Sequence, residues 1–415
     1  MSERRRVVIT GMGIVSPLGY QVDEFWERLI ASESGIRQIQ LFDTTEFDVK
    51  FGGECSDFSP EPVVDKRSAK RLDRFAQMGI VAAHGAWTQS GLADGGVTDP
   101  TRFGVITGTG IGGIAELEDQ HRRLVEKGPS KVSAFTIPKL MSNAASGNIS
   151  IMLGACGPST AVGTACASAT NAMGDAMHAI RRGDVDIVIS GGSEAALTPL
   201  GMSAFASMKA LSTRNDDPQR ASRPFDRDRD GFVMGEGAGM VVLEEYEHAK
   251  KRGANILCEL LGFGTSADAF HITQPQENGI GASAAMRSAV QDARINLDDV
   301  DYINAHGTST PLGDIAETLA IKKVFGAHAK KVAVSSTKSA VGHLLGASGG
   351  VELIASIQAL RNGVIPPTIN LENQDPECDL NYTPLTAQDA KVDIALSNSF
   401  GFGGHNACVI VGRVK

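Results

Sequence analysis

Two stretches of this chain follow one pattern: Phe103-Gly-Val-Ile-Thr-Gly-Thr-Gly-Ile-Gly-Gly-Ile-Ala-Glu116 and Tyr302-Ile-Asn-Ala-His-Gly-Thr-Ser-Thr-Pro-Leu-Gly-Asp-Ile-Ala-Glu317. In each, an apolar run ends in small and polar residues and then enters a helix-like segment. Strand-like and helix-like segments alternate along the whole chain, which is typical of α/β architecture. Two further pairs of segments align in the same order: Val162–Cys166 with Val334–Lys338, and Asp184–Ser193 with Lys391–Ser399. The repeated order predicts a duplicated α/β unit with different insertions in each copy.

The boundary between the copies is predicted near Gly253, after a helix-like segment at Glu244–Arg252. This divides the chain into an N-terminal half, residues 1–253, and a C-terminal half, residues 254–415. Sites in open parallel α/β sheets form at the carboxyl ends of strands. If the halves pack about a pseudo-twofold axis, the equivalent loops of both halves converge on one pocket. The alternative is that they line opposite ends of an ordinary sheet.

The cysteine of the first half has a distinctive context. Cys166 lies in Ser159-Thr-Ala-Val-Gly-Thr-Ala-Cys-Ala-Ser-Ala-Thr170, just before a predicted helix over Asn171–Ile180. Unpaired N–H groups and the dipole at a helix N-terminus favour a thiolate. The small neighbours let a substrate carbonyl approach. The competing interpretation is an inert buried cysteine in a strand-to-helix turn, because free cysteine is often fully buried.

Three later segments carry further reactive side chains beside Gly, Ser and Thr. His306, Lys338 and His343 each lie just after an apolar run in these segments. Taken singly, each residue could simply pack in the core or carry a surface charge. Together with Cys166 they predict a nucleophile with proton and oxyanion partners. The segments are Asn304–Pro311, Ser335–Ala347 and Ser397–Asn406.

Composition excludes several classes of function. The 415 residues are 42% hydrophobic and 21% charged, as in ordinary globular proteins, and the net charge of -9 argues against a nucleic-acid partner. The 47 glycines indicate many tight strand-to-helix connections. Six cysteines without close pairing argue against a metal site and a disulfide framework, so we expect a reducing, cytoplasmic location.

The N-terminal segment imitates a signal peptide. Arg4-Arg5-Arg6 precedes the apolar run Val7–Val15, but Thr10 and two glycines interrupt that run and a turn-like Ser16–Gly19 follows. A first β-strand is the better prediction. No other segment approaches the uninterrupted apolar length of a membrane span, so no membrane partner is expected.

The four motifs together resemble those of the β-ketoacyl-acyl carrier protein synthases. The resemblance rests on Thr164–Ser168, Asn304–Pro311, Lys338–His343 and Asn398–Gly404, in that order, and runs from Arg5 to near the C-terminus. The most similar members are the elongating enzymes of bacterial type II fatty acid synthesis. The resemblance implies a thiolase-like fold with two similar α/β halves in five α-β-α-β-α layers, a homodimer, and acyl carrier protein as partner.

The resemblance also implies a mechanism, a decarboxylating Claisen condensation that gives 3-oxoacyl-acyl carrier protein in fatty acid elongation. Cys166 takes the acyl chain from the carrier protein, and malonyl-carrier protein then loses carbon dioxide. His306 and His343 stabilise the enolate, while the backbone N–H groups of Cys166 and Phe402 hold the oxyanion of acyl transfer. No cofactor is expected, because the phosphopantetheine arrives on the carrier protein.

Lys338 has two interpretations in this scheme. It either acts directly on a proton or forms an ion pair that orders the site, and the resemblance favours the ion pair, with Glu352 as partner and Asp314 nearby. A carboxylate partner is also expected physically, because an uncompensated lysine in an apolar pocket loses its proton.

The substrate pocket is assigned from the same motifs. The hydroxyls of Thr308 and Thr310 suit an amide-bearing phosphopantetheine arm, although threonines in turns also bond locally. Ile111 and Phe400 are expected to border the acyl tunnel. The glycines around Phe400 predict a mobile loop in which this ring acts as a gate, with plain packing as the alternative.

Docking of an acidic carrier protein requires a local basic patch on this acidic chain. The segment Lys66–Arg74 supplies basic residues at helical spacing and would present one basic face if it is helical. A merely solvated face is the other interpretation. The docking residues assigned in this way are Lys66, Arg67, Lys70, Arg71 and Arg74, and Lys209 is expected to join them.

Related enzymes and a silent subunit are the alternative interpretations of this sequence. A thiolase needs a second cysteine in the last glycine loop, and starter-type synthases use Cys-His-Asn, whereas here the third position is His343. A non-catalytic partner subunit would lack the nucleophile. The sequence leaves open the acyl chain length, a polyketide instead of a fatty acid pathway, and the role of His405, which stands where threonine is common in the family.

Overall fold

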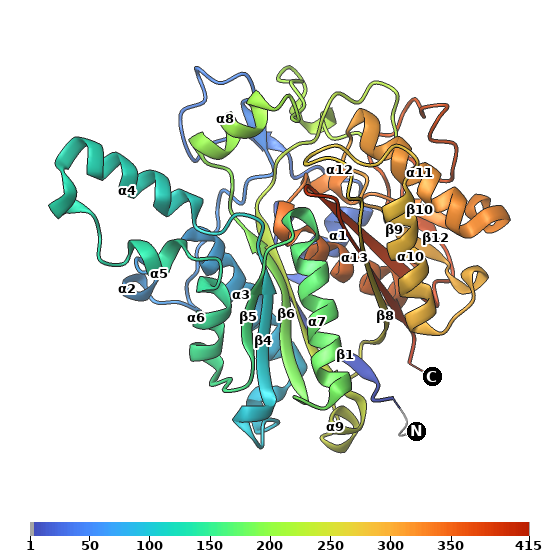
Figure 1. Cartoon of the computed structure of the whole chain (residues 1–415), viewed down its shortest axis with the longest axis horizontal. Coiled ribbons are helices and arrows are strands. Elements are labelled where there is room, and N and C mark those ends of the chain that lie inside the picture. The colour runs from blue at the N-terminus through green and yellow to red at the C-terminus, as the bar shows by residue number, and fades with distance from the viewer. Residues whose placement is uncertain (1–3, 415) are drawn as a thin grey trace.

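The computed structural model describes residues 4–414 and builds the chain around a ten-stranded sheet (Figure 1). The strand order is β10-β9-β13-β14-β8-β1-β7-β6-β4-β5, so that each half of the chain supplies one half of the sheet. The N-terminal strands are β1 (Val7–Val15), β4 (Phe103–Gly108), β5 (Ser159–Val162), β6 (Ile187–Glu194) and β7 (Gly237–Glu245). The C-terminal strands are β8 (Cys258–Ala267), β9 (Tyr302–Asn304), β10 (Ala333–Ser335), β13 (Ile394–Gly401) and β14 (His405–Gly412).

The two halves repeat one topology strand for strand. β4 pairs in parallel with β5 and β6, and β9 pairs in parallel with β10 and β13. In both halves the sheet then continues through antiparallel neighbours, in the orders β6-β7-β1 and β13-β14-β8. The halves join where β1 pairs with β8 over two residues on each strand. The internal repeat seen in the sequence, with β4 matching β9 and β5 matching β10, is therefore confirmed.

Helices form three layers around the two half-sheets. α7 (Ser168–Arg182) and α13 (Ser348–Asn362) contact each other and strands of both halves, so they form the middle layer. α3 (Arg74–Ser90) and α6 (Ala144–Leu153) cover the outer face of the first half, and α10 (Ile280–Ala293), packed against α11 (Pro311–Phe325), covers that of the second. The expected α-β-α-β-α order is thus confirmed.

Sequence explains why α13 lies in the middle. Every residue from Ser348 to Leu360 is buried, and a helix that is buried all round belongs in an interior layer. Gly239 on β7 and Gly350 on α13 touch backbone to backbone, since a Cβ on Gly350 would lie 2.2 Å from the Gly239 oxygen. This close approach seats α13 directly on the sheet.

The remaining elements lie around this frame. α4 and α5 project from the body as an arm, and α2 lies below it (Figure 1). Two small two-stranded sheets pair β2 with β3 and β11 with β12. These elements are α1 (Val22–Ile30), α2 (Lys66–Ala69), α4 (Ile114–Lys127), α5 (Thr136–Leu140), α8 (Pro199–Ser207), α9 (Tyr246–Lys251), α11 (Pro311–Phe325), α12 (Lys338–Val341), β2 (Arg37–Gln38), β3 (Phe51–Gly52), β11 (Val364–Ile365) and β12 (Gln388–Asp389).

The strand and helices predicted from local sequence agree with the structure to different degrees. The first strand at Val7–Val15 is confirmed, and the helix predicted over Asn171–Ile180 is the interior of α7. The helix predicted from Glu244 begins two residues later, because Glu244 still pairs with β1 and β6 and the Glu245 side chain caps α9. Within residues 4–414 no helix is long and apolar enough to cross a membrane. The division at Gly253 stays a prediction.

Candidate active site

Cys166 lies in the turn that joins β5 to α7. It belongs to the short 3-10 turn Ala165–Ala167, which leads directly into the N-terminus of α7, as the sequence predicted. The hydroxyl of Ser168 braces the turn by accepting the Thr164 N–H at 2.9 Å and donating to the Ala165 carbonyl at 2.6 Å. The Cys166 side chain is buried and faces a cavity.

Two backbone N–H groups are directed at the sulfur of Cys166. Those of Cys166 itself and of Phe402 hydrogen-bond to the thiol and lower its pKa, as does the charge of Lys338. Burial acts in the opposite direction and is stronger, so the pKa of Cys166 rises to about 11. The helix N-terminus therefore does not produce a resting thiolate, and a neighbouring base has to remove the proton.

His306 and His343 meet edge to face above the same cavity. Their ring centroids are 5.3 Å apart with an interplanar angle of 86°, and both rings are buried. Burial and the positive charge of Lys338 hold the pKa of both imidazoles well below the ordinary histidine value. Both rings are therefore neutral at pH 7, and a neutral imidazole both accepts a proton and donates an N–H.

Lys338 and Glu352 form a buried ion pair behind the histidines. Their side chains are 1% and 2% exposed, and the ammonium contacts the Glu352 carboxylate directly. The same ammonium lies 3.5 Å from Nδ1 of His306. Because an ammonium can only donate, it favours the tautomer of His306 that carries its proton on Nε2. This geometry matches the expected ion-pair role of Lys338.

Asp314 does not support Lys338 as expected. Its carboxylate pairs with Arg229 at 3.5 Å and accepts the Phe225 N–H at 2.8 Å, and burial raises its pKa to about 7. Glu317, one turn later on α11, supports the active-site loop instead, and the sequence alone did not single it out. It accepts the N–H groups of His306 and Gly307 at 2.8 and 2.7 Å.

The sequence carried a signal for Glu317. It stands three residues after Asp314 in the helix that follows the His306 loop, so the two carboxylates lie on one face of that helix. Burial raises the pKa of Glu317, and the charge of Lys338 and bonds from Asn398 and the His306 loop lower it. Glu317 therefore fixes the backbone of the His306 loop.

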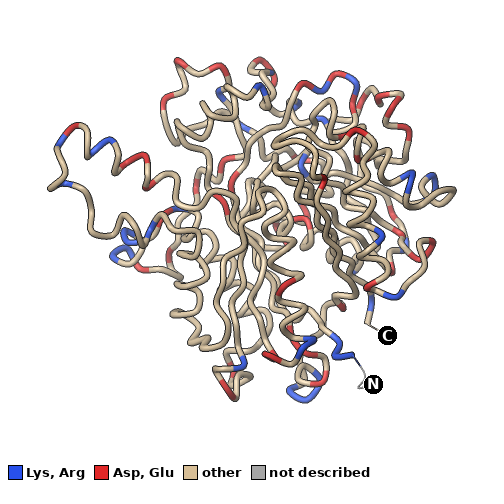
Figure 2. The backbone as a smooth tube through the Cα atoms, in the orientation of Figure 1, with Lys and Arg blue, Asp and Glu red and all other residues tan. Residues whose placement is uncertain are grey.

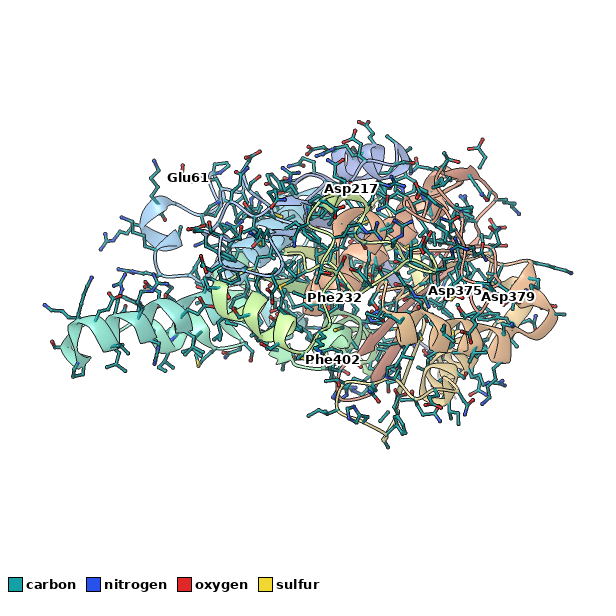
Figure 3. The ribbon with its side chains drawn as sticks, turned by 90° about the horizontal axis from the view of Figure 1, so that it is seen from above. Glu61, Asp217, Phe232, Asp375, Asp379 and Phe402 are labelled. Atoms are coloured by element: carbon teal, nitrogen blue, oxygen red, sulfur yellow. The ribbon has the colours of Figure 1, made fainter. Side chains whose placement is uncertain are left out.

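One cavity of about 680 Å³ collects most of the predicted site. It lies between the two halves, where Figure 3 labels two of its lining residues, Phe232 and Phe402, near the middle of the molecule. Lys338, Glu352 and Asp314 lie outside the lining. The predicted residues that line it are Cys166, His306, His343, Ile111, Thr308, Thr310, Phe400, Phe402 and Lys209.

Two pocket predictions concern side chains at the cavity wall, and both roles stay predictions. The hydroxyls of Thr308 and Thr310 lie 3.0 Å apart at the cavity wall, where an amide-bearing arm would meet them. Phe400, however, does not lie in a free loop, because it is paired with Asn406 within β13 and β14 and its ring lies 5.6 Å from that of His306. The turn itself contains Phe402, and Phe400 lines the cavity beside it, so the gate role of Phe400 stays a prediction.

The sequence models of two domains match this chain. Residues 4–249 match the β-ketoacyl synthase N-terminal domain, and residues 257–372 match the C-terminal domain of the same enzymes. The chain belongs to the β-ketoacyl synthase family. This confirms the resemblance read from the four motifs, while the chemical role of each side chain stays a prediction.

Relatives of this β-ketoacyl synthase are similar over nearly their full length. The 3-oxoacyl-[acyl-carrier-protein] synthase 2 of Synechocystis is 50% identical over 404 residues, 97% of each chain. That of Coxiella burnetii is 49% identical over 412 residues, 99% of each chain. Among solved structures, a Burkholderia phymatum β-ketoacyl synthase has a TM-score of 0.91 at 34% identity, covering 99% of this chain and 100% of the other. A type II PKS ketosynthase, solved with its acyl-carrier protein and bound to a hexaketide, has a TM-score of 0.93 at 33% identity, with all of both chains covered.

The predicted basic face of this β-ketoacyl synthase is shorter than expected. α2 ends at Ala69, and the buried Leu72 and Asp73 separate it from α3, whose first turn Asp73 caps. Arg74 was wrongly assigned to docking, because its guanidinium bonds to the buried carboxylate of Glu236 at 2.7 and 2.8 Å.

Five of the docking residues remain exposed. Four lie together at the α2 end of the molecule, where Figure 2 shows a concentration of basic residues. Lys209 is separate, at the rim of the active-site cavity. The four residues of this basic patch are Lys66, Arg67, Lys70 and Arg71.

The buried histidines make the stability of this β-ketoacyl synthase depend on pH. Their pKa is lowered on folding, so below the ordinary histidine pKa of about 6.5 the unfolded chain binds protons that the folded chain does not. We expect the free energy of unfolding to fall from pH 7 to pH 5, by up to about 1.4 kcal/mol per pH unit for each histidine. Urea unfolding of His343→Gln should show a shallower fall.

His121→Gln is the matched control for this experiment, because His121 is an exposed histidine on α4. It should keep the pH dependence of the wild type. If His343→Gln and the wild type lose the same free energy between pH 7 and pH 5, the proposed neutral state of His343 is wrong.

Proposed function

We propose that this chain catalyses the decarboxylating Claisen condensation of a Cys166-bound acyl chain with malonyl-acyl carrier protein, which yields 3-oxoacyl-acyl carrier protein in fatty acid elongation. The main evidence is that one cavity brings together the Cys166 thiol, two N–H groups directed at it and two neutral imidazoles. The names of the curated relatives support the reaction, and the carrier-protein complex of a structural neighbour supports the partner.

Acyl transfer uses the N-terminal half of the site. The sulfur of Cys166 attacks the acyl thioester carbonyl as His343 takes the thiol proton, and the carrier thiolate leaves and regains that proton. The N–H groups of Cys166 and Phe402, which already bond to the sulfur, are placed to donate to the carbonyl oxygen as it becomes negative. Each such donor contributes about 3 kcal/mol to a transition state of this kind.

Condensation uses the C-terminal half of the site. The malonyl C–C bond breaks, carbon dioxide leaves, and the electron pair passes to an enolate whose oxygen accepts N–H bonds from His306 and His343. The enolate carbon attacks the acyl carbonyl on Cys166, the new C–C bond forms, and the sulfur leaves as a thiolate. Lys338 orders this step through His306, while Glu352 compensates its charge.

The substrate arm and cofactor follow from the same proposal. The enzyme needs no resident cofactor, because the phosphopantetheine thioester is part of the carrier protein. The hydroxyls of Thr308 and Thr310, at the wall of the cavity, are suited to the amides of that arm. Ile111, 41% exposed although large and apolar, is suited to contact the acyl chain.

Docking of the carrier protein is proposed at the basic patch of Lys66, Arg67, Lys70 and Arg71. The double variant Lys70→Glu/Arg71→Glu should raise the KM for carrier-bound substrates about tenfold at low salt and leave kcat unchanged, because exposed charges mainly affect encounter. Steady-state kinetics at two ionic strengths measure this.

The matched control for docking is Arg182→Glu, which reverses an exposed charge at the end of α7. It should leave KM as in the wild type. An unchanged KM in the Lys70→Glu/Arg71→Glu variant, or an equal rise in the control, would show that these residues do not dock the carrier protein. The basic patch would then be only a solvated surface.

Assembly as a homodimer is part of the proposal. β5 is an edge strand of the sheet, and its Ser159 and Thr160 are exposed. Large apolar side chains are also exposed on the neighbouring helices, and a second copy of this chain would cover both features at once. These side chains are Leu117, Leu124, Val125, Phe135, Ile137, Met141 and Ile151.

A cytoplasmic location is also proposed. All six cysteines of the chain are described in the structure and all are free thiols. Free thiols, one of them the proposed nucleophile, persist in a reducing compartment.

The deciding experiment measures carbon–carbon bond formation directly. Wild-type enzyme is incubated with acyl-carrier protein and malonyl-carrier protein, and mass spectrometry of the carrier detects the 3-oxoacyl product. Intact-mass analysis of the enzyme without malonyl-carrier protein should show one acyl group, on the peptide containing Cys166. An active carrier protein that yields neither the adduct nor the product would refute the proposed function.

A further inference from the structure

The glycine loop that follows β4 encloses a buried carboxylate. Glu194, the last residue of β6, is fully buried, and its oxygens accept the N–H groups of Gly110 at 2.6 Å, Ile111 at 3.2 Å and Gly112 at 3.3 Å. The hydroxyl of Thr109 donates to it as well, at 2.9 Å. Successive N–H groups that converge in this way form an anion-binding nest, and here the anion is a side chain of the same protein.

The same carboxylate also reaches the C-terminal half. It accepts the N–H of Gly346 at 3.0 Å, in the short 3-10 turn Leu345–Ala347 that begins two residues after His343. Both glycines are required by contact, because a Cβ on Gly110 or on Gly346 would lie 2.8 or 2.7 Å from a Glu194 oxygen. Glu194 thus ties together one loop from each half.

These two loops carry walls of the active-site cavity. Ile111 and Leu345 both line it beside Cys166, whereas Glu194 does not. A Cβ on Gly110 would lie 3.5 Å from the carbonyl of Ala165, so the glycine loop also packs against the turn of the nucleophile. The carboxylate therefore lies behind the part of the cavity wall that Ile111 and Leu345 form.

We propose that Glu194 is a positioning residue for acyl transfer, which holds Ile111 and Leu345 against Cys166 and so sets the acyl chains that the enzyme accepts. This rests on the proposed function. Burial raises the pKa of Glu194, and the bonds from Gly110, Thr109, Ile111 and Gly346 lower it. The charge of Glu194 in turn raises the pKa of Cys166, which gives the proposal a second, independent readout.

The test compares Glu194→Gln with Glu244→Gln. Glutamine keeps the size of the side chain but replaces one accepting oxygen by an NH₂ group, which cannot accept the loop N–H bonds. Glu244 is an equally buried carboxylate that bonds to Arg252 and His248, and it does not line the cavity. Circular dichroism and thermal melting first establish that both variants fold.

Acyl transfer should separate the two variants. For Glu194→Gln we expect acylation of Cys166 by a long acyl-carrier protein to slow about 100-fold, the loss typical of a misplaced reacting group. The preference between long and short chains should change, while the KM for malonyl-carrier protein stays within about threefold. Glu244→Gln should match the wild type in all three quantities. Wild-type acylation and chain preference in a folded Glu194→Gln would overturn the proposal.

Alkylation by iodoacetamide gives the readout that needs no carrier protein. Loss of the Glu194 charge should move the pH midpoint for alkylation of Cys166 to lower pH, and Glu244→Gln should leave it in place. If wild type makes no 3-oxoacyl product, the proposed function fails, yet this comparison still decides whether Glu194 acts on the thiol. An unchanged midpoint in Glu194→Gln counts against the proposal.

Glu194→Asp separates charge from reach and also serves if Glu194→Gln does not fold. Aspartate keeps the charge but is one methylene shorter, so it cannot meet the donors of both loops at once. We expect changed chain preference with the alkylation midpoint of the wild type. A Glu194→Asp variant with wild-type chain preference would overturn the positioning role.

Discussion

Cys166→Ala is expected to lower the rate of 3-oxoacyl product formation by about a million-fold, the scale on which enzymes lose rate when a covalent nucleophile is removed. The whole proposed mechanism passes through a thioester on this sulfur, and the cavity holds no other cysteine among its lining residues. The residual rate would come from binding alone. Stopped assays with mass detection of the carrier protein measure both rates.

The fold should tolerate this change. Alanine removes one buried sulfur, a loss on the order of 1 kcal/mol, so the melting temperature should move by only a few degrees. Cys156→Ala is the matched control, because Cys156 is the exposed cysteine of the chain and lies outside the cavity lining. Product formation by Cys166→Ala near the wild-type rate would exclude covalent catalysis at this residue.

Lys338→Met is expected to destabilise the protein by about 3–5 kcal/mol, because it leaves the buried carboxylate of Glu352 without its counter-charge. One oxygen of that carboxylate already has no hydrogen-bond partner within the described residues. The rate of condensation should fall by a factor of about 10² to 10⁴, since His306 also loses the donor that fixes its tautomer.

The double variant Lys338→Met/Glu352→Met separates these two effects. An apolar pair of similar size should restore most of the stability, but it cannot restore the charge beside His306, so the rate should stay low. Lys322→Met, which breaks an exposed pair with Asp379, is the control and should cost about 0.2–1 kcal/mol. If the double variant recovers the wild-type rate, Lys338 has no ordering role.

The sequence predicted the architecture because the repeat was visible in it. Matching the loop after Phe103 to the loop after Tyr302 identified β4 with β9, and the structure gives the two strands equivalent parallel neighbours, β5 and β6 for β4 and β10 and β13 for β9. The chemical residues were also predictable, since the thiol, the two imidazoles and the ammonium each follow an apolar run. What joins them, a pseudo-twofold packing, follows from the repeat itself.

Predictions failed where a tertiary partner overrode a local pattern. The helical spacing of basic residues from Lys66 includes Arg74, but the buried Glu236 draws that guanidinium inward. The sequence places Asp314 among the residues that support Lys338, but Arg229, far away in sequence, forms its ion pair. The glycines after Phe400 predict a loop around it, whereas strand pairing continues through Phe400 and leaves Phe402 in the turn.

The role of Glu194 could not be predicted from the sequence for a related reason. It ends an unremarkable strand in the sequence, and its five donors come from Thr109–Gly112 and Gly346, which lie about 80 and 150 residues away. A glycine-rich loop predicts an anion without saying which one. Only the folded chain identifies it as a carboxylate of the protein itself.

The middle layer of two helices, one from each half, has a consequence for synthesis on the ribosome. α7 is complete at Arg182, but α13, which packs against it, is complete only at Asn362. At ordinary translation rates those roughly 180 residues take about 10 to 40 s. Throughout that time the nascent chain exposes an apolar helix face and a thiol without its histidines. Chaperone capture of chains stalled between these two points is therefore to be expected, and the finished enzyme should not share that dependence.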